Sequence, residues 1–176
     1  VEEIGLFYLG ESFMAPDVLI GAIEWCKQEL EIPYVFLTTN GSLAAQDLVF
    51  DAMKAGLDSL KWSVNAADEE QFEKIMGVKK SLFWKSLSNL REAWHIRDSN
   101  KFKCGLYASS IQYDGAQGEK MSKLIQDHVT PWVDQHYWLP LYQMSMNIDK
   151  VKQDTGFTPT AGNQGRIGAL RPPLPC

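Results

Sequence analysis

Short apolar runs alternate with amphipathic stretches along most of the chain. The apolar runs predict five β-strands, at residues 4–9, 34–37, 57–64, 102–111 and 133–144. Between them, apolar residues recur every three or four positions, which is the spacing of one helix face. This spacing predicts helices around residues 16–31, 45–53, 83–94 and 121–129.

Local signals support these boundaries. Pro16 stands where the first turn of a helix tolerates proline. Gly56 follows the second helical stretch as an expected C-cap, and Asp68 with Gln71 resembles a capping box that opens a further short helix. Pro140 is expected at the end of the fifth strand or at a bulge.

Five strands separated by helices predict an α/β fold with a parallel sheet. A doubly wound sheet and a barrel both satisfy this pattern. Residues 145–176 differ, because they are rich in glycine and proline and show no apolar periodicity. They are expected to form a linker.

Composition narrows the class of protein. The 176 residues include 45% hydrophobic residues, enough for the core of one domain. The net charge of −5 and the scattered basic residues disfavour nucleic acid as a partner, and no apolar run is long enough to span a membrane. Cys26, Cys104 and Cys176 are odd in number and far apart, which fits a reducing compartment and gives no short-spaced metal site.

Polar residues follow four successive strands, at the sheet edge where parallel α/β folds bind ligands. They are Gly10, Glu11, Ser12, Thr39, Asn40, Gly41, Ser63, Asn65, Ser109, Ser110 and Gln112. Each residue alone is expected in a cap or a turn, whereas the set together indicates a ligand site. No common catalytic motif is present. His95 and His128 fall on helices, and His136 lies in the fifth strand.

The order of these strand-end motifs resembles the radical SAM enzymes, specifically the branch with a Cys-rich SPASM-type extension. The matching segments, in chain order, are Tyr8-Leu9-Gly10-Glu11-Ser12, Thr39-Asn40-Gly41-Ser42-Leu43, Ala55-Gly56-Leu57-Asp58-Ser59-Leu60, Trp62-Ser63-Val64-Asn65, Phe72-Glu73-Lys74-Ile75-Met76-Gly77 and Leu174-Pro175-Cys176. They look like the family's Gly-Gly-Glu-Pro turn, its Thr-Asn-Gly turn, its fourth strand, the helix after it, and the Pro-Cys that opens the extension.

The resemblance implies a partial (β/α)6 barrel without its first strand. Residues 1–144 would hold the second to sixth strands, and residues 145–176 would lead to a truncated extension. The family's Cys-x-x-x-Cys-x-x-Cys motif, which binds a [4Fe–4S] cluster, does not occur in this chain. We therefore expect a sequence truncated at both ends, inactive by itself, from an enzyme that cleaves S-adenosylmethionine to a 5′-deoxyadenosyl radical.

The same resemblance implies roles for individual residues. Gly10 and Glu11 match the turn that holds the methionyl amino group, and Ser63 and Asn65 match positions near the ribose and carboxylate. Asn40 would shape the site or serve the turn at Gly41, and either Ser109 or Ser110 would approach the cofactor. Cys176 would bind an auxiliary cluster. A peptide, sugar or small-molecule substrate, an electron donor such as a flavodoxin or ferredoxin, and a cytoplasmic location are also implied.

Lys61 shares a strand face with Ser63 and Asn65 by period-two alternation. Since a buried lysine is unfavourable unless it is paired, Lys61 either binds a carboxylate of cofactor or substrate or extends its ammonium group to a barrel end. Two other functions stay open. One is a degenerate, non-catalytic barrel that binds peptides, and the other is an unrelated barrel enzyme that uses Glu11 and Lys61 as acid and base.

Overall fold

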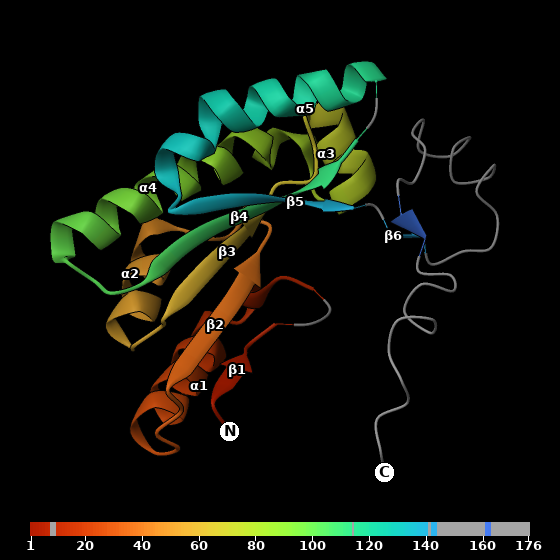
Figure 1. Ribbon diagram of the computed structural model, residues 1–176. Helices are drawn as coiled ribbons and strands as arrows, with labels where there is room; N and C mark the ends of the chain where they lie inside the picture. The colour runs from red at the N-terminus through yellow and green to blue at the C-terminus, as the bar shows by residue number, and fades with distance from the viewer. Residues whose placement is uncertain (8–9, 114, 141, 144–160, 163–176) are drawn as a thin grey trace, which may run out of the picture.

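The computed structural model describes residues 1–7, 10–113, 115–140, 142–143 and 161–162. Its centre is a five-stranded parallel sheet with the strand order β1-β2-β3-β4-β5 (Figure 1). The strands are β1 (Glu3–Gly5), β2 (Tyr34–Thr39), β3 (Ser59–Ser63), β4 (Gly105–Gln112) and β5 (Gln135–Pro140). The helices are α1 (Pro16–Gln28), α2 (Gln46–Lys54), α3 (Glu69–Met76), α4 (Phe83–Asn100) and α5 (Gly115–His128). The 3-10 turns are η1 (Ser12–Met14), η2 (Lys80–Leu82) and η3 (Thr130–Trp132).

The predicted alternation of strands and helices is confirmed, with shifted ends. The first strand is shorter than predicted, since β1 ends at Gly5. The last predicted helix begins earlier, at Gly115. In the predicted linker, the structure describes only β7 (Ala161–Gly162), which pairs with β6 (Tyr142–Gln143) in parallel.

The strand order and the position of the helices bear on the two architectures that the sequence left open. A doubly wound sheet reverses its strand order at a switch point, which places helices on both faces. The described strands follow one another without reversal, and helices α1, α2, α4 and α5 lie on one side of the sheet (Figure 1). The described part of the chain is therefore a singly wound parallel α/β sheet.

Period-two alternation gives the sheet two different faces. Val35, Leu37, Leu60, Trp62 and Leu106 are almost completely buried in one core with the apolar sides of the helices. The intervening residues point to the opposite face, which we call the open face. Those that line a cavity are Tyr34, Phe36, Thr38, Ser59, Lys61, Ser63, Tyr107, Gln135 and Tyr137.

Two aspartates fasten the amino ends of the strands in the same way. Asp58, directly before β3, accepts hydrogen bonds from the backbone N–H of Val35 at 2.7 Å and from Nζ of Lys27, which lies in α1, at 2.9 Å. Asp58 N in turn donates to Val35 O at 2.9 Å. We call this the Asp58 clamp.

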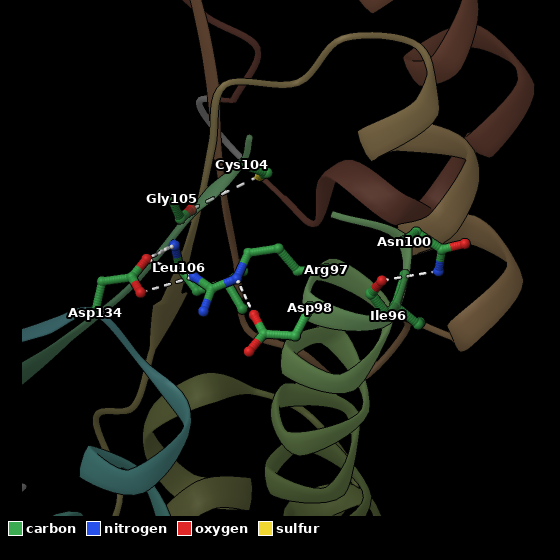
Figure 2. Close-up of polar contacts among 8 residues, drawn as sticks. All are labelled: Ile96, Arg97, Asp98, Asn100, Cys104, Gly105, Leu106 and Asp134. Atoms are coloured by element: carbon green, nitrogen blue, oxygen red, sulfur yellow. Dashed lines mark hydrogen bonds and ion pairs between the residues drawn. The ribbon is translucent and has the colours of Figure 1, made fainter. Parts of the chain in front are cut away.

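The second clamp stands between β4 and β5 (Figure 2). Asp134, directly before β5, accepts from Leu106 N at 2.7 Å and from Nη1 of Arg97, which lies in α4, at 2.6 Å, while Asp134 N donates to Leu106 O at 2.8 Å. Nε of Arg97 also donates to Asp98. In this Asp134 clamp, as in the first, one carboxylate joins two strands and a helix.

The predicted caps are also present. Gly56 follows α2 with φ +106°, a conformation that L side chains rarely adopt. Asp68 caps α3 by accepting from Gln71 N at 2.8 Å, and Gln71 Oε1 accepts from Ala67 N at 2.7 Å. No helix within the described ranges is long and apolar enough to cross a membrane.

Candidate ligand site at the carboxyl edge of the sheet

A cavity of about 500 Å³ lies where strands β1, β2 and β3 end. Five of the eight residues predicted to bind the cofactor line it, namely Gly10, Glu11, Asn40, Ser63 and Asn65. The rest of the wall consists of Phe7, Met14, Thr38, Thr39, Met76, Gly77 and Val78. Strand-end motifs that are far apart in the sequence therefore meet around one cavity, which we call the edge cavity.

Glu11 joins the loop after β1 to the loop after β2. Its Oε1 accepts from Oγ1 of Thr39 at 2.6 Å and from Phe13 N at 3.3 Å, and its Oε2 accepts from Asn40 N at 2.7 Å. The carboxylate thus orders both loops. Because an ionised carboxylate offers about four acceptor positions, it keeps room for one further donor.

The turn after β2 is held from below by α4. The side chain of Asn40 serves the turn itself, since its Oδ1 accepts from Ser42 N at 2.9 Å. From α4, Ser86 Oγ donates to Asn40 O at 2.6 Å and Asn89 Nδ2 donates to Gly41 O at 2.8 Å. These bonds fix the height of the turn at the rim of the cavity.

Gly41 is required by both conformation and space. Its φ is +78°, and a Cβ atom at this position would lie 2.2 Å from Nε1 of Trp62, whose side chain is fully buried. The turn therefore packs directly onto the indole, and no other residue fits without displacing it.

The wall formed by the end of β3 carries an unused acceptor. Tyr113 Oη donates to the backbone O of Asn65 at 2.5 Å, and burial raises the pKa of this tyrosine to about 12, so that it remains a donor. The side-chain Oδ1 of Asn65 is buried, and no donor for it exists in the described part of the chain. A buried acceptor without a partner in a cavity wall is what a ligand donor would satisfy.

Lys61 lies one strand-face position before Ser63, outside the edge cavity. It lines a second cavity of about 290 Å³ on the open face, which we call the face cavity. Burial lowers the pKa of Lys61. Thr38 lines both cavities and lies beside Lys61 in the register of β2 and β3.

Ser109 and Ser110 point to opposite faces of the sheet, because side chains alternate along a strand. Ser109 lies on the open face, beside Ser63 of β3 and Tyr137 of β5 in the register, and is buried. Ser110 lies on the helix-covered face, where its Oγ is 3.0 Å from Nε2 of His136, and burial lowers the pKa of that histidine. Ser110 and His136 therefore point away from the open face, and neither residue lines the face cavity or the edge cavity.

Among the described residues, no group of three or more His, Cys, Asp or Glu side chains could hold a metal ion. Cys26 and Cys104 are buried thiols within the core, and burial raises the pKa of Cys104 to about 12. The described residues therefore offer no ligands for an iron–sulfur cluster. Cys176, the predicted ligand of an auxiliary cluster, and Tyr8 and Leu9 of the first motif lie outside the described residues.

Comparison with known proteins gives a match in structure but not in sequence. No protein-family model and no curated protein sequence match the chain. A crystal structure of a domain of pyruvate-formate lyase-activating enzyme from Bacteroides vulgatus ATCC 8482 superimposes with a TM-score of 0.59 and 18% sequence identity, covering 88% of this chain and 95% of that domain. The two chains share a fold.

Proposed function

We propose that this chain is the S-adenosylmethionine-binding core of a radical SAM enzyme of the SPASM-type branch. The observation that carries the proposal is the meeting of Gly10, Glu11, Asn40, Ser63 and Asn65 around the edge cavity. The motifs that contain these residues are far apart in the sequence. The shared fold adds support, because pyruvate-formate lyase-activating enzyme is itself a radical SAM enzyme.

The polar groups of the cavity suit the polar groups of S-adenosylmethionine. The free acceptor position on Glu11 suits the methionyl ammonium group, which has only donors. Oδ1 of Asn65 and the hydroxyl of Ser63 suit the ribose hydroxyls, which donate and accept. The volume of about 500 Å³ falls within the range of small-molecule sites.

The proposal places the ligands of the [4Fe–4S] cluster outside this chain. When S-adenosylmethionine is bound at such a cluster, it supplies a 5′-deoxyadenosyl radical that removes hydrogen from a substrate. The chain's own residues would bind and orient the cofactor and keep water away from it. The proposal extends to a barrel of six strands, an electron donor such as a flavodoxin or ferredoxin, and a cytoplasmic location. It also includes a Cys-rich extension to which residues 145–175 lead and in which Cys176 is the first ligand of an auxiliary cluster.

The first test is calorimetric titration of the chain with S-adenosylmethionine. Asn65→Ala removes an acceptor that has no partner within the described structure, so we expect binding about tenfold weaker and a melting temperature that does not fall. Ser59→Ala is the matched control, because Ser59 lies on the same face of β3 but lines only the face cavity.

Two results would count against the proposal: no binding by the unaltered chain, or equal affinity in the Asn65→Ala variant. The reaction itself is tested on the product of the whole gene, after anaerobic reconstitution with iron and sulfide. We expect 5′-deoxyadenosine when a reductant and S-adenosylmethionine are added. If no 5′-deoxyadenosine forms and the protein binds peptides, the degenerate, non-catalytic barrel is favoured instead.

A further inference from the structure

The face cavity has its own set of donors and lies against the edge cavity. Its lining consists of Glu3, Tyr34, Phe36, Thr38, Ser59, Lys61, Tyr107, Gln135 and Tyr137. Because Thr38 lines both cavities, a molecule in the face cavity would reach the wall that the two cavities share. This is the position of a second ligand beside a first.

Lys61, the cation of the face cavity, has no counter-ion among the described residues. None of the ion pairs found among the described residues includes Lys61, and Glu3, which lines the same cavity, forms none with it. The Nζ atom of Lys61 lies instead 6.0 Å from the ring centre of Phe7 and 5.9 Å from that of Tyr137. A half-buried ammonium group among rings is a binding position for an anion.

A second donor stands beside this cation. Thr38 and Lys61 are neighbours in the register of β2 and β3, and Oγ1 of Thr38 is buried without a hydrogen-bond partner in the described structure. Burial, and then the nearby tyrosine hydroxyls, raise the pKa values of Tyr107 and Tyr137, so both stay protonated and able to donate. The ammonium of Lys61 and the hydroxyl of Thr38 therefore belong to neighbouring residues of the cavity wall and can serve one anionic group, while the hydroxyls of Tyr107 and Tyr137 add further donors to the lining.

Aromatic rings form much of the remaining wall, which Glu3, Ser59 and Gln135 complete. The rings of Tyr34, Phe36, Tyr107 and Tyr137 line the cavity, and its volume of about 290 Å³ is at the lower limit for small-molecule sites. We propose that the face cavity binds a small aromatic carboxylic acid, with its carboxylate on Lys61 and Thr38 and its ring between the aromatic walls. The binding of this acid does not depend on the function proposed for the edge cavity. Its role as the substrate does rest on that proposed function.

Three probes separate charge from shape. Benzoate has both the ring and the carboxylate, benzamide has the ring without the charge, and acetate has the charge without the ring. We expect the full chain to bind benzoate at least about tenfold more tightly than either of the others, measured by NMR chemical-shift titration. Equal affinity for benzoate and benzamide would overturn the proposal.

Two variants test the assigned donors. In Lys61→Met, the preference for benzoate over benzamide should fall below about twofold, because the charge is removed while the length of the side chain is kept. Lys85→Met is the control, since Lys85 is an exposed residue of α4 and lies outside the cavity. Thr38→Val keeps the shape of the residue and should weaken benzoate binding about threefold, which tests the site even if the first variant misfolds. Unchanged benzoate binding in either variant would overturn the assignment.

Competition separates the two proposals. We expect benzoate and S-adenosylmethionine to bind together, each without reducing the affinity of the other. If benzoate displaces S-adenosylmethionine, Lys61 serves the cofactor carboxylate, and the separate acid site is refuted. If benzoate binds but S-adenosylmethionine does not, the function proposed for the edge cavity fails while the acid site stands.

Discussion

The polar groups at the two edges of the sheet differ in whether their hydrogen bonds are complete. At the amino edge, the Asp58 and Asp134 clamps use each carboxylate for a strand N–H and a basic side chain of a helix. At the carboxyl edge, Thr38 and Asn65 each keep a buried oxygen that has no partner in the described part of the chain. The polar groups of the two clamps are all bonded to one another, whereas the carboxyl edge combines bonded groups, such as Glu11 with Thr39, with these two oxygens that have no partner in the described part of the chain.

This difference divides stability from binding within one sheet. Bonds that are complete without a ligand stabilise the fold at all times. Groups left without partners lower the stability of the unliganded chain and become useful only when a ligand arrives. The same division is known for barrels, whose active sites lie at the carboxyl face.

The largest expected effect is an exception to this division, because Gly41 lies at the carboxyl edge and yet determines stability. Gly41→Ala combines a φ of +78° with a Cβ atom 2.2 Å from Nε1 of the buried Trp62, so we expect a loss of about 4 kcal/mol in the free energy of unfolding. Urea denaturation measures it. Gly77→Ala has a positive φ but no atom within 4 Å of the new Cβ, and should lose only about 1 kcal/mol. Equal losses would mean that backbone strain alone explains the glycine.

The next effect tests whether the Asp134 clamp stabilises the fold at the amino edge. Asp134→Ala leaves Leu106 N and Arg97 without their shared acceptor, and the Arg97 side chain is only 13% exposed. We expect a loss of about 2–3 kcal/mol in the same denaturation experiment. Asp98→Ala removes an exposed partner of the same arginine that accepts no strand N–H, and should lose less than about 0.5 kcal/mol. A large loss in the control would refute the role given to the strand N–H.

A smaller effect of opposite sign is expected in the face cavity. Lys61→Met removes a half-buried charge whose pKa is lowered by burial, which means that folding disfavours the protonated lysine. The unliganded variant should be more stable than the original chain by up to about 1 kcal/mol at pH 7. Thermal melting checks this, with Lys85→Met expected to melt unchanged. A destabilised Lys61→Met variant would give Lys61 a structural role.

The smallest effect concerns pH on the helix-covered face. Burial lowers the pKa of His136, so the unfolded chain binds a proton on this residue more readily than the folded chain. The stability connected with neutral His136 is therefore present above pH 6.5 and is lost as the pH falls through the folded-state pKa. We expect the melting temperature of His136→Gln to fall less than that of the original chain between pH 7 and pH 5. Parallel curves would contradict this.

Much of the fold follows from short-range signals that a sequence contains. Apolar runs and helical periodicity located the strands and helices, and Asp68 with Gln71 located a cap, because these patterns depend on residues close together in the chain. The motifs also named most of the edge cavity. The strand order, by contrast, is a property of the whole sheet, so the sequence alone left two architectures open.

The missing parts of the site depend on contacts distant in sequence. Ser86 and Asn89 support the turn at Asn40 from α4, and nothing near them in the sequence indicates that turn. The clamps join residues 23 and 28 positions apart, so no local sequence pattern indicates them. The two neighbours Ser109 and Ser110 were not distinguished, although a fixed strand register would have assigned them to opposite faces.

The clamps also bear on how such a chain can evolve. A strand that slips by one residue turns its side chains to the wrong face, and each clamp would lose its carboxylate bonds in such a slip. None of the clamp residues lines the edge cavity. Residues around the edge cavity can therefore change, within the limit that the packing of Gly41 on Trp62 sets, while the register stays fixed at the other edge. In a duplicated gene, the ligand could change without the architecture being rebuilt, and a designer could graft new loops there for the same reason.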